Sequence, residues 1–235
     1  GRLKLSKAVS IGWFGLLINV ANGPNADNPL GKDARVRRAF DLAIDREALN
    51  QVVFNGEFVP GNQWVNPENF YYQPKFPVPK RDLVKAKALL QEAGVTKRIP
   101  IDFMVSNTPE TRAVAEVVQS MVGEAGFDLK IRVTEVATAL KQAEDGNFQL
   151  YMNTWSGRID PDGNSVIYQM CGAPQNMGKY CNPEVDKLHE QARAVTDPAQ
   201  RKAIYETLAD KFLADGWILY LYHPQYLIAH TVRLE

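Results

Sequence analysis

The 235-residue sequence predicts an α/β domain, in which helices pack on a sheet. Three observations lead to this prediction. Segments of strand character alternate with segments of helical periodicity along most of the chain. Several expected helices begin at an Asp, Asn or Thr cap, often with proline directly after it. The composition, with 45% hydrophobic and 23% charged residues, is that of a globular chain long enough to bury a core without a metal or disulfide.

The first fifth of the chain contains strand and helix signals separated by a loop. Residues 5–20 carry β-branched and aromatic side chains and predict one or two strands. Residues 22–31 are rich in Asn, Gly and Pro and predict a loop. Residues 33–49 predict one helix capped by Asp33, because their apolar side chains recur at helical spacing. That stripe consists of Val36, Ala39, Phe40, Ala43 and Ile44. The arginines that fall largely outside it are expected on a solvated face: Arg35, Arg37 and Arg38.

The middle of the chain begins with a long segment of Pro, Gly, Asn and aromatic residues at 55–80. Because disordered segments are poor in aromatics, we expect an ordered, extended loop here. Helix and strand then alternate. The caps of the first two helices are clear, with Gly94 ending one and Thr108 followed by Pro109 starting the next. The expected helices are 81–94, 108–126 and 138–146, and the expected strands are 99–106, 127–136 and 148–155.

The last third repeats this pattern. One helix is expected over 182–195, with Asn182 as its cap and proline next. A second is expected over 197–216, where Asp197 and the glutamine three residues later form a capping-box arrangement. Residues 217–231 predict two strands separated by Pro224. The alternation is therefore maintained to the end of the sequence.

Charge and hydropathy exclude several classes of protein. Lys+Arg and Asp+Glu both number 27, and a net charge of zero argues against a nucleic-acid partner. The longest apolar run, residues 11–21, is too short to span a bilayer and is interrupted by Asn19. The first seven residues show no cleavage-site pattern, and they resemble the middle of a longer chain.

Motifs for nucleophilic, phosphate-binding or zinc chemistry are missing from the sequence. No GxSxG, P-loop, dinucleotide glycine pattern or HExxH occurs. The three histidines have no common ligand spacing, so we expect ordinary surface or strand residues. These residues are His189, His223 and His230. We expect no cofactor.

The segment 154–165, TWSGRIDPDGNS, concentrates groups that can bind a ligand. It follows an expected strand, and ligands of open α/β sheets sit beyond the carboxyl ends of strands. Trp155 offers a flat apolar surface, and Arg158 offers a bidentate fork for a carboxylate or phosphate. We expect Asp160 or Asp162 to hold Arg158 in place. The predicted ligand-binding residues are Trp155, Gly157, Arg158, Asp160, Asp162 and Asn164.

Other interpretations of this segment remain open. In a purely structural one, Trp155 packs in the core and Arg158 with Asp160 is a local ion pair. A calcium loop fits poorly, because its sixth position is Ser165 and its twelfth is Cys171. A hydrolase using Asp160 and Asp162 as its carboxylate pair is an alternative function, because only their separation in space decides it.

The two cysteines, Cys171 and Cys181, lack the spacing of a redox motif and the further ligands of a zinc site. Two alternatives are open. They are free thiols, or they form a short-loop disulfide in an oxidising compartment, which we favour. Closing so short a loop stabilises the fold by about 2.5–3 kcal/mol in the chain-entropy model.

Several segments, taken together and in order, resemble solute-binding family 5, the peptide- and nickel-type extracellular solute-binding proteins of ABC transporters. FGLLINV resembles the strand that ends in the family's characteristic Asn, here Asn19. DARVRRAFDLAIDREAL resembles the family's most recognisable helix. DLVKAKALLQEAG, WSGRIDPDGNS and the segment 181–222 resemble later family segments in the same order. The resemblance covers nearly the whole chain, and the helix signature with the combined order is its most specific part.

The resemblance implies a periplasmic-binding-protein type II-like lobe, with a mixed sheet flanked by helices. Family members have two lobes that enclose the ligand, and residues 1–235 correspond to the second, C-terminal lobe alone. The hinge crossings are expected near 10–20 and 220–230, and the N-terminal lobe is absent from this chain. A disulfide in the region of Cys171 and Cys181 occurs in some dipeptide-binding relatives.

The implied function is the substrate-binding component of an ABC importer, which is not an enzyme. It captures a peptide or other small solute between its lobes and delivers it to the permease subunits in the membrane. We expect a periplasmic or extracellular monomer. A carrier of a metal chelate, as in the nickel-type branch, is an alternative.

One position departs from the family pattern. Peptide-binding relatives carry an Asp three residues after the Trp, where it takes the peptide's free amino group, and here that position is Arg158. An arginine repels an ammonium group. We therefore expect Arg158 to contact an anionic group of the solute, while Asp160 in a shifted turn is the alternative partner for an amine.

Overall fold

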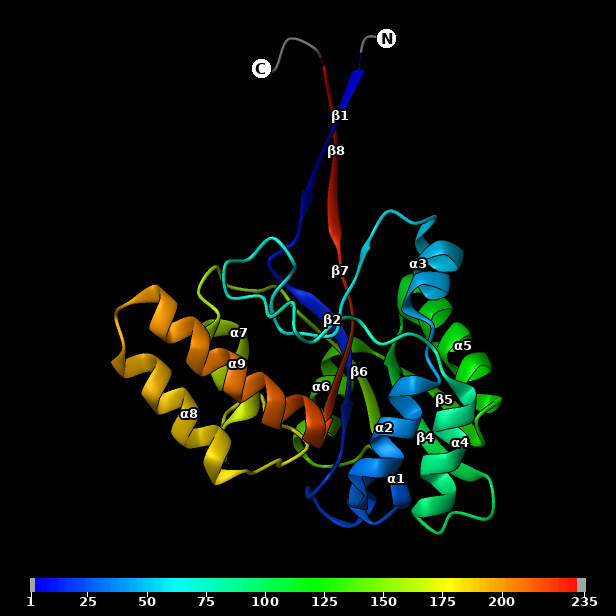
Figure 1. Ribbon diagram of the computed structural model, residues 1–235. Coiled ribbons are helices and arrows are strands. Elements are labelled where there is room, and N and C mark those ends of the chain that lie inside the picture. The colour runs from blue at the N-terminus through cyan, green and yellow to red at the C-terminus, as the bar shows by residue number, and fades with distance from the viewer. Residues whose placement is uncertain (1–2, 232–235) are drawn as a thin grey trace.

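A six-stranded mixed sheet forms the centre of the computed structural model, which describes residues 3–231 (Figure 1). The strand order is β3-β7-β2-β6-β4-β5. Four strands run parallel, whereas β2 and β3 run antiparallel to their neighbours. The six strands are β2 (Trp13–Ile18), β3 (Val59–Pro60), β4 (Ile99–Ser106), β5 (Phe127–Thr134), β6 (Leu150–Trp155) and β7 (Ile218–His223).

Helices cover both faces of this sheet, each over its own apolar core. The short 3-10 helix η1 (Pro24–Ala26) precedes the first of them. One layer consists of α1 (Pro29–Lys32), α2 (Ala34–Leu42), α3 (Arg46–Phe54), α4 (Leu83–Glu92) and α5 (Pro109–Gly123). The other consists of α6 (Val136–Glu144), α7 (Asp162–Gln169), α8 (Pro183–Ala194) and α9 (Pro198–Asp215).

Alternation along β2 explains why two cores exist. Successive side chains of a strand point to opposite faces. Leu16 and Ile18 enter the core under α2 and α5, whereas Trp13 and Leu17 enter the core under α9. These four side chains are fully buried. A strand buried on both faces is therefore a nearly continuous apolar run, as β2 is.

The strands β1 (Leu3–Val9) and β8 (Gln225–Thr231) form a separate antiparallel ribbon that leaves the body of the molecule. Val9 pairs with Gln225, next to the body, and Leu3 pairs with Thr231 at the far end. Nearly all ribbon side chains are exposed, apolar ones such as Leu5 and Ile228 included. The two strands expected within 217–231 are confirmed as β7 and β8, separated by Pro224.

The capping signals placed most helices correctly. Thr108 accepts a hydrogen bond from Thr111 N, and Asn182 and Asp197 cap α8 and α9 in the same way. Gly94 follows the end of α4 in the left-handed conformation, as expected of a helix-ending glycine. The strand at 99–106 has the predicted bounds. Local sequence therefore determines these elements.

The single helix expected over 33–49 is instead two helices, α2 and α3. Asp45 interrupts it with an extended backbone and caps α3 by accepting from Ala48 N at 2.9 Å. The carbonyls at the end of α2 have partners far along the chain. Leu42 O accepts from Asp82 N, and Ala43 O accepts from Arg81 Nε, both at 2.8 Å. These distant donors stabilise a break that helical periodicity does not reveal.

The expected solvated face of α2 is wrong at Arg37, which is buried. Its Nε donates to Asp215 O at 2.6 Å, at the end of α9, and its Nη1 donates to Gly31 O at 2.9 Å. Burial lowers the pKa of the guanidinium, and the nearby Asp215 carboxylate opposes that shift. Arg37 therefore connects α2, in one helical layer, with the end of α9, in the other.

Candidate functional site

The carboxyl ends of the parallel strands meet at the edge of the sheet from which the ribbon leaves. Trp155 ends β6 there, and His223 ends β7. The helix α5 begins just after β4, so its amino end also lies at this edge. This is the place where open α/β sheets bind ligands. The segment 154–165 lies at this position, as the sequence predicts.

The turn after β6 crosses the start of β2 at backbone contact distance. Gly157 has a φ of 86°, a conformation that favours glycine. A Cβ built on Gly157 would lie 2.3 Å from the Ile11 carbonyl carbon, and one built on Gly12 would lie 2.1 Å from Trp155 O. Gly157 therefore shapes the turn through its backbone and lacks a side chain to contact a ligand.

Asn164 holds this turn together from the inside. It is fully buried, and its Oδ1 accepts from Trp155 Nε1 at 3.0 Å and from Arg158 N at 2.6 Å. Its Nδ2 donates to Arg158 O at 2.9 Å. Because every hydrogen bond of the amide is internal, Asn164 positions Trp155 and Arg158. Its burial and internal partners support a structural role in place of the predicted ligand contact.

Arg158 lies over the face of Trp155, with its guanidinium carbon 4.9 Å from the ring centroid. Nη1 donates to Gly157 O at 2.6 Å, and the aliphatic part of the side chain covers Gly163. The residue is exposed, and no residue within 3–231 is found as a partner of its Nε or Nη2. A guanidinium stacked on an aromatic ring with free donors can bind a planar anion.

The expected pairing of Arg158 with an aspartate is wrong. Asp160 instead accepts hydrogen bonds from both Nη atoms of Arg201, at 2.7 and 2.8 Å. Asp162 accepts from Arg193 Nε at 3.0 Å. The hydrogen bonds from Arg201 hold the pKa of Asp160 below its usual value. A general acid needs a raised pKa, so this arrangement gives no support to a hydrolase using Asp160 and Asp162.

The helix α7, which begins at Asp162, is absent from the sequence-based prediction. Its first residues, Asp162, Gly163 and Asn164, favour turns over helices. It forms because its inner face is buried on the sheet. Tyr168 contacts Trp13 and Trp155 edge-on, with ring centroids 4.9 and 5.8 Å apart. The predicted binding segment is therefore half turn and half helix.

Sequence reasoning missed the apolar surroundings of this turn. A cavity of about 370 Å³ adjoins it, lined by residues of the loop after β3 and by Ile11 and Ile159. Ile159 is 80% exposed and Phe70, in that loop, is 56% exposed. Asn69 Nδ2 donates to Ile159 O at 3.2 Å and joins the loop to the turn. The aromatic content of 55–80 is the only signal that pointed to this surface.

A charged residue that the sequence analysis also missed is Glu110, in the first turn of α5. It is exposed at the same edge, and its carboxylate accepts from Tyr222 OH at 3.3 Å. Tyr222 stacks on Phe14, and Phe14 pairs with Thr154 next to Trp155. Glu110 and Arg158 thus lie at one edge, near opposite faces of the sheet.

The expectation of ordinary surface or strand histidines is wrong for His189, which is fully buried in α8. Its Nε2 lies 3.1 Å from Gln169 Oε1, and burial lowers its pKa to about 3. His223 lies on a strand but is also fully buried, with Nδ1 2.7 Å from Gly12 O. Burial lowers its pKa to about 4. His230 lies on the ribbon strand β8, as expected.

The two cysteines form the disulfide Cys171–Cys181, which confirms the favoured alternative. The bond closes the loop between α7 and α8. Within residues 3–231, no group of three or more His, Cys, Asp or Glu side chains is arranged to hold a metal ion. In the same described range, no helix combines the length and apolar character that crossing a membrane requires.

Comparison with known proteins finds a family match over most of the chain. Residues 3–178 match the model of the bacterial extracellular solute-binding proteins, family 5 middle region. A dipeptide-binding protein of Escherichia coli is 29% identical over 244 residues, covering 100% of this chain and 44% of that protein. The oligopeptide-binding protein AppA of Bacillus subtilis is 27% identical, covering 91% and 42%. The chain thus spans less than half the length of these relatives.

Solved structures share the fold. A putative peptide-binding protein AppA from Clostridium difficile superposes with a TM-score of 0.88 at 20% identity, over 99% of this chain and 48% of that one. DppA from Helicobacter pylori, in complex with the peptide STSA, gives 0.85 at 23% identity, over 100% and 46%. NikA from Staphylococcus aureus, in complex with Ni(L-His)2, gives 0.84 at 22% identity, over 100% and 50%. These similarities confirm the expected type II-like α/β fold, with its mixed sheet flanked by helices.

Proposed function

Because the chain belongs to the bacterial extracellular solute-binding proteins of family 5, we propose that it is one lobe of the substrate-binding component of an ABC importer. The whole protein captures a peptide or another small solute between two lobes and delivers it to the permease subunits in the membrane. It works as a monomer in the periplasm or outside the cell. It binds its solute without transforming it, as solute-binding proteins do.

The observation that carries this proposal is the stacked pair at the carboxyl edge of the sheet, formed by the exposed Arg158 and the half-buried Trp155. Asn164 fixes both residues from within, so their geometry exists before any solute arrives. Preorganised groups lose little freedom on binding. A carboxylate or phosphate of the solute accepts from Arg158, and a flat or apolar part of the solute rests against Trp155.

Glu110 completes the charge pattern that we propose for this edge. Its carboxylate lies across the sheet from Arg158, beside Tyr222. A peptide carries one positive and one negative end, so it can place its ammonium toward Glu110 and its carboxylate toward Arg158. This orientation reverses what an Asp at position 158 would impose.

Closure follows from contacts that only one arrangement of the lobes allows. A solute bound at Arg158 and Trp155 alone leaves its other face in water. When a second lobe covers that face, further contacts form and shift the population toward the closed form. The ribbon of β1 and β8, which leaves the body at this edge, is the connection around which we propose that the lobes move.

The experiment that tests this function is native mass spectrometry of the full-length protein, purified gently from its own compartment. We expect a retained small molecule that carries an anionic group. Identification of that molecule supplies the solute for titrations. Two results together would contradict the proposal. The protein retains no small molecule, and its Trp fluorescence does not change on titration with mixed peptides.

A further inference from the structure

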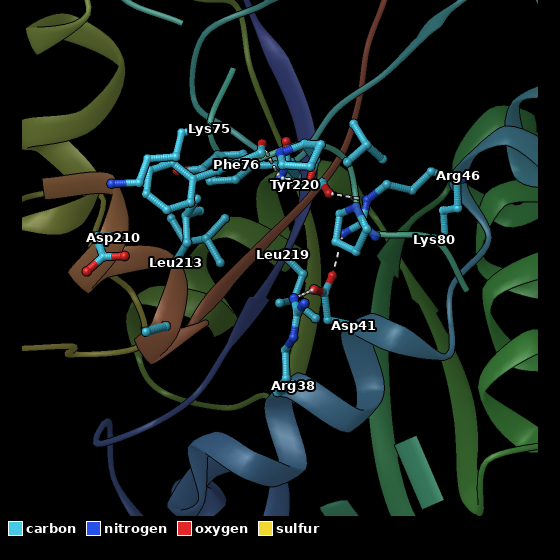
Figure 2. Close-up of a pocket in the computed structure, with 16 residues that line it drawn as sticks. Arg38, Asp41, Arg46, Lys75, Phe76, Lys80, Asp210, Leu213, Leu219 and Tyr220 are labelled. Carbon is cyan, nitrogen blue, oxygen red and sulfur yellow. Dashed lines mark hydrogen bonds and ion pairs between the residues drawn. The ribbon is translucent and has the colours of Figure 1, made fainter. Parts of the chain in front are cut away.

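A cavity of about 760 Å³ lies at the opposite side of β7 from β2, where the sheet lacks a full edge strand (Figure 2). The edge strand β3 has only two residues, which pair with Tyr222 and His223. The earlier part of β7, Ile218 to Tyr220, therefore has no strand on its outer side. The cavity occupies this gap, between α2 and the end of α9 and beneath the loop at 75–80.

The floor of this cavity carries a buried cation. The side chain of Arg46 is only 1% exposed, and its Nε donates to Tyr220 O at 2.9 Å and to Gly61 O at 3.1 Å. Its Nη2 donates to Asp41 Oδ1 at 2.5 Å. The other oxygen of Asp41 accepts from Arg38 Nη1 at 2.6 Å. Two arginines thus share one carboxylate, and the cluster retains one positive charge.

Two residues that line the cavity each carry a buried polar atom without a partner. Within residues 3–231, neither Arg46 Nη1 nor Asn62 Oδ1 has a hydrogen-bond partner, although both are buried. The two residues are neighbours in space, because Arg46 binds Gly61 O and Asn62 follows Gly61. A buried unmatched donor or acceptor costs the fold free energy. Arg46 Nη1 is a donor and Asn62 Oδ1 is an acceptor. A ligand that satisfies both atoms therefore needs an acceptor group and a donor group, and a bare anion has no donor.

The remaining lining defines the rest of such a ligand. Lys80 is exposed at the Arg46 end, and no ion pair of Lys80 is found among the described residues. Phe76 and Leu213 line the other end, where Lys75 is paired with Glu206 (Figure 2). The volume is in the range of sites that hold small organic molecules. One end is therefore cationic, and the other offers an apolar surface.

We propose that this cavity is a second ligand site, which binds a small carboxylic acid with a hydroxyl or amino group on the neighbouring carbon and an apolar side chain. The carboxylate accepts from Arg46 Nη1 and faces Lys80. The hydroxyl or ammonium group donates to Asn62 Oδ1. The side chain lies along Phe76 and Leu213.

This site is separate from the turn after β6. Its lining shares no residue with 154–165, and it lies on the other side of β2, against the half of β7 that pairs with Leu16 and Leu17. It does not depend on the proposed transport function. Its ligand binds whether or not a solute occupies the edge at Arg158.

The test uses three probes with the same ring and carboxylate: phenylalanine, 3-phenyllactate and 3-phenylpropionate. Binding is followed by NMR shifts of the Leu213 and Ala214 amides in the full protein carrying Arg158→Glu, which disables the first site if our proposed function is right. We expect the two probes with a donor group to bind about tenfold more tightly than 3-phenylpropionate. Equal affinities for the three probes would overturn the assignment of Asn62.

Two variants locate the site with matched controls. Ala214→Trp places an indole at the cavity from an exposed helix position, and we expect it to abolish the shift of the Leu213 amide, whereas Ala203→Trp on the same helix leaves that shift unchanged. Lys80→Glu weakens binding several-fold, and Lys85→Glu, the same charge change outside the cavity, does not. Wild-type binding by folded Ala214→Trp and Lys80→Glu, or a crystal soaked with phenyllactate that shows only water between Arg46 and Asn62, would overturn the proposal.

Discussion

The guanidinium of Arg158 rests on the ring of Trp155 and makes no ion pair with Asp160. This arrangement separates two roles within one short segment. Asp160 and Asp162 tie the turn to Arg201 and Arg193 on the neighbouring helices, while Arg158 keeps donors directed to solvent. The exposed guanidinium of Arg158, stacked on the half-buried Trp155, is therefore the part of the segment that is available to a solute.

Replacing Arg158 tests whether its charge contributes to solute binding more than to the stability of the fold. We expect Arg158→Gln to weaken binding of an anionic solute about tenfold to a hundredfold, because a hydrogen bond to a charged group is worth about 1.5–3 kcal/mol. The free energy of unfolding should change by less than about 1 kcal/mol, since an exposed cation–π pair contributes no more. Calorimetric titration and urea unfolding measure the two effects. Arg98→Gln, an exposed arginine elsewhere, is the control, and equal affinities of the two variants would refute the role of Arg158.

Replacing Asn164 tests its role inside the turn. Asn164→Ala leaves Trp155 Nε1 and Arg158 N without their acceptor. We expect the free energy of unfolding to fall by about 2–3 kcal/mol, the cost of unmatched buried donors. Asn147→Ala, at an exposed position, should change it by less than about 0.5 kcal/mol. Urea unfolding of both variants provides the comparison, and similar losses would show that Asn164 has no special part.

Two of the glycines with positive φ, Gly157 and Gly172, allow a matched comparison. Both have positive φ, but a Cβ on Gly157 meets the backbone of Ile11, whereas one on Gly172 meets open space. We expect Gly172→Ala to cost about 1 kcal/mol of strain. Gly157→Ala should cost about 3 kcal/mol or more, because the backbone of residues 11–12 must move as well. Thermal unfolding of the two variants tests this ranking, which a smaller loss for Gly157→Ala would contradict.

The disulfide supplies a further test. We expect replacement of Cys171 and Cys181 by alanine to lower the free energy of unfolding by about 2.5–3 kcal/mol, since the open loop gains entropy in the unfolded chain. The wild-type protein in a strong reductant should lose the same amount. If reductant leaves its urea midpoint unchanged, the bond contributes nothing to stability.

Acid should destabilise the protein through its buried histidines. Burial lowers the pKa of His189 to about 3 and that of His223 to about 4, while both titrate near about 6.5 in the unfolded chain. Between these values the unfolded chain binds more protons, so the free energy of unfolding falls as pH falls from about 6.5 toward 4. We expect His223→Asn to remove about 2 kcal/mol of the loss between pH 7 and 4.5.

Urea unfolding at the two pH values measures this difference. His230→Asn, on the exposed ribbon, serves as the control and should keep the full loss. An identical pH dependence in the His223→Asn variant and the wild type would contradict the assignment to His223.

Elements with local signals were predictable from the sequence, and those that depend on distant partners were not. Thr108, Asn182 and Asp197 mark their helices because a cap acts within three residues. The break before α3 depends on donors from residues 81 and 82, and Arg37 is buried against Asp215. No local pattern reports such contacts.

The site shows the same division. The position of 154–165 at a strand end follows from the order of elements, and the binding roles of Trp155 and Arg158 stay predictions. The pairing of Asp160 with Arg201 joins residues 41 positions apart, and the fully buried Asn164 acts inside the turn. Glu110 and Phe70 come from other parts of the chain, so only the folded structure shows that they lie beside this edge.

The ribbon of β1 and β8 has a mechanical consequence. Its seven residue pairs alternate between hydrogen-bonded and non-hydrogen-bonded pairs, and the hydrogen bonds lie in the plane of the ribbon. Bending out of this plane leaves those bonds nearly intact, whereas bending within the plane slides one strand against the other and strains each of them. The body of the molecule therefore moves most easily in one direction relative to the far end of the ribbon, out of the plane of the ribbon.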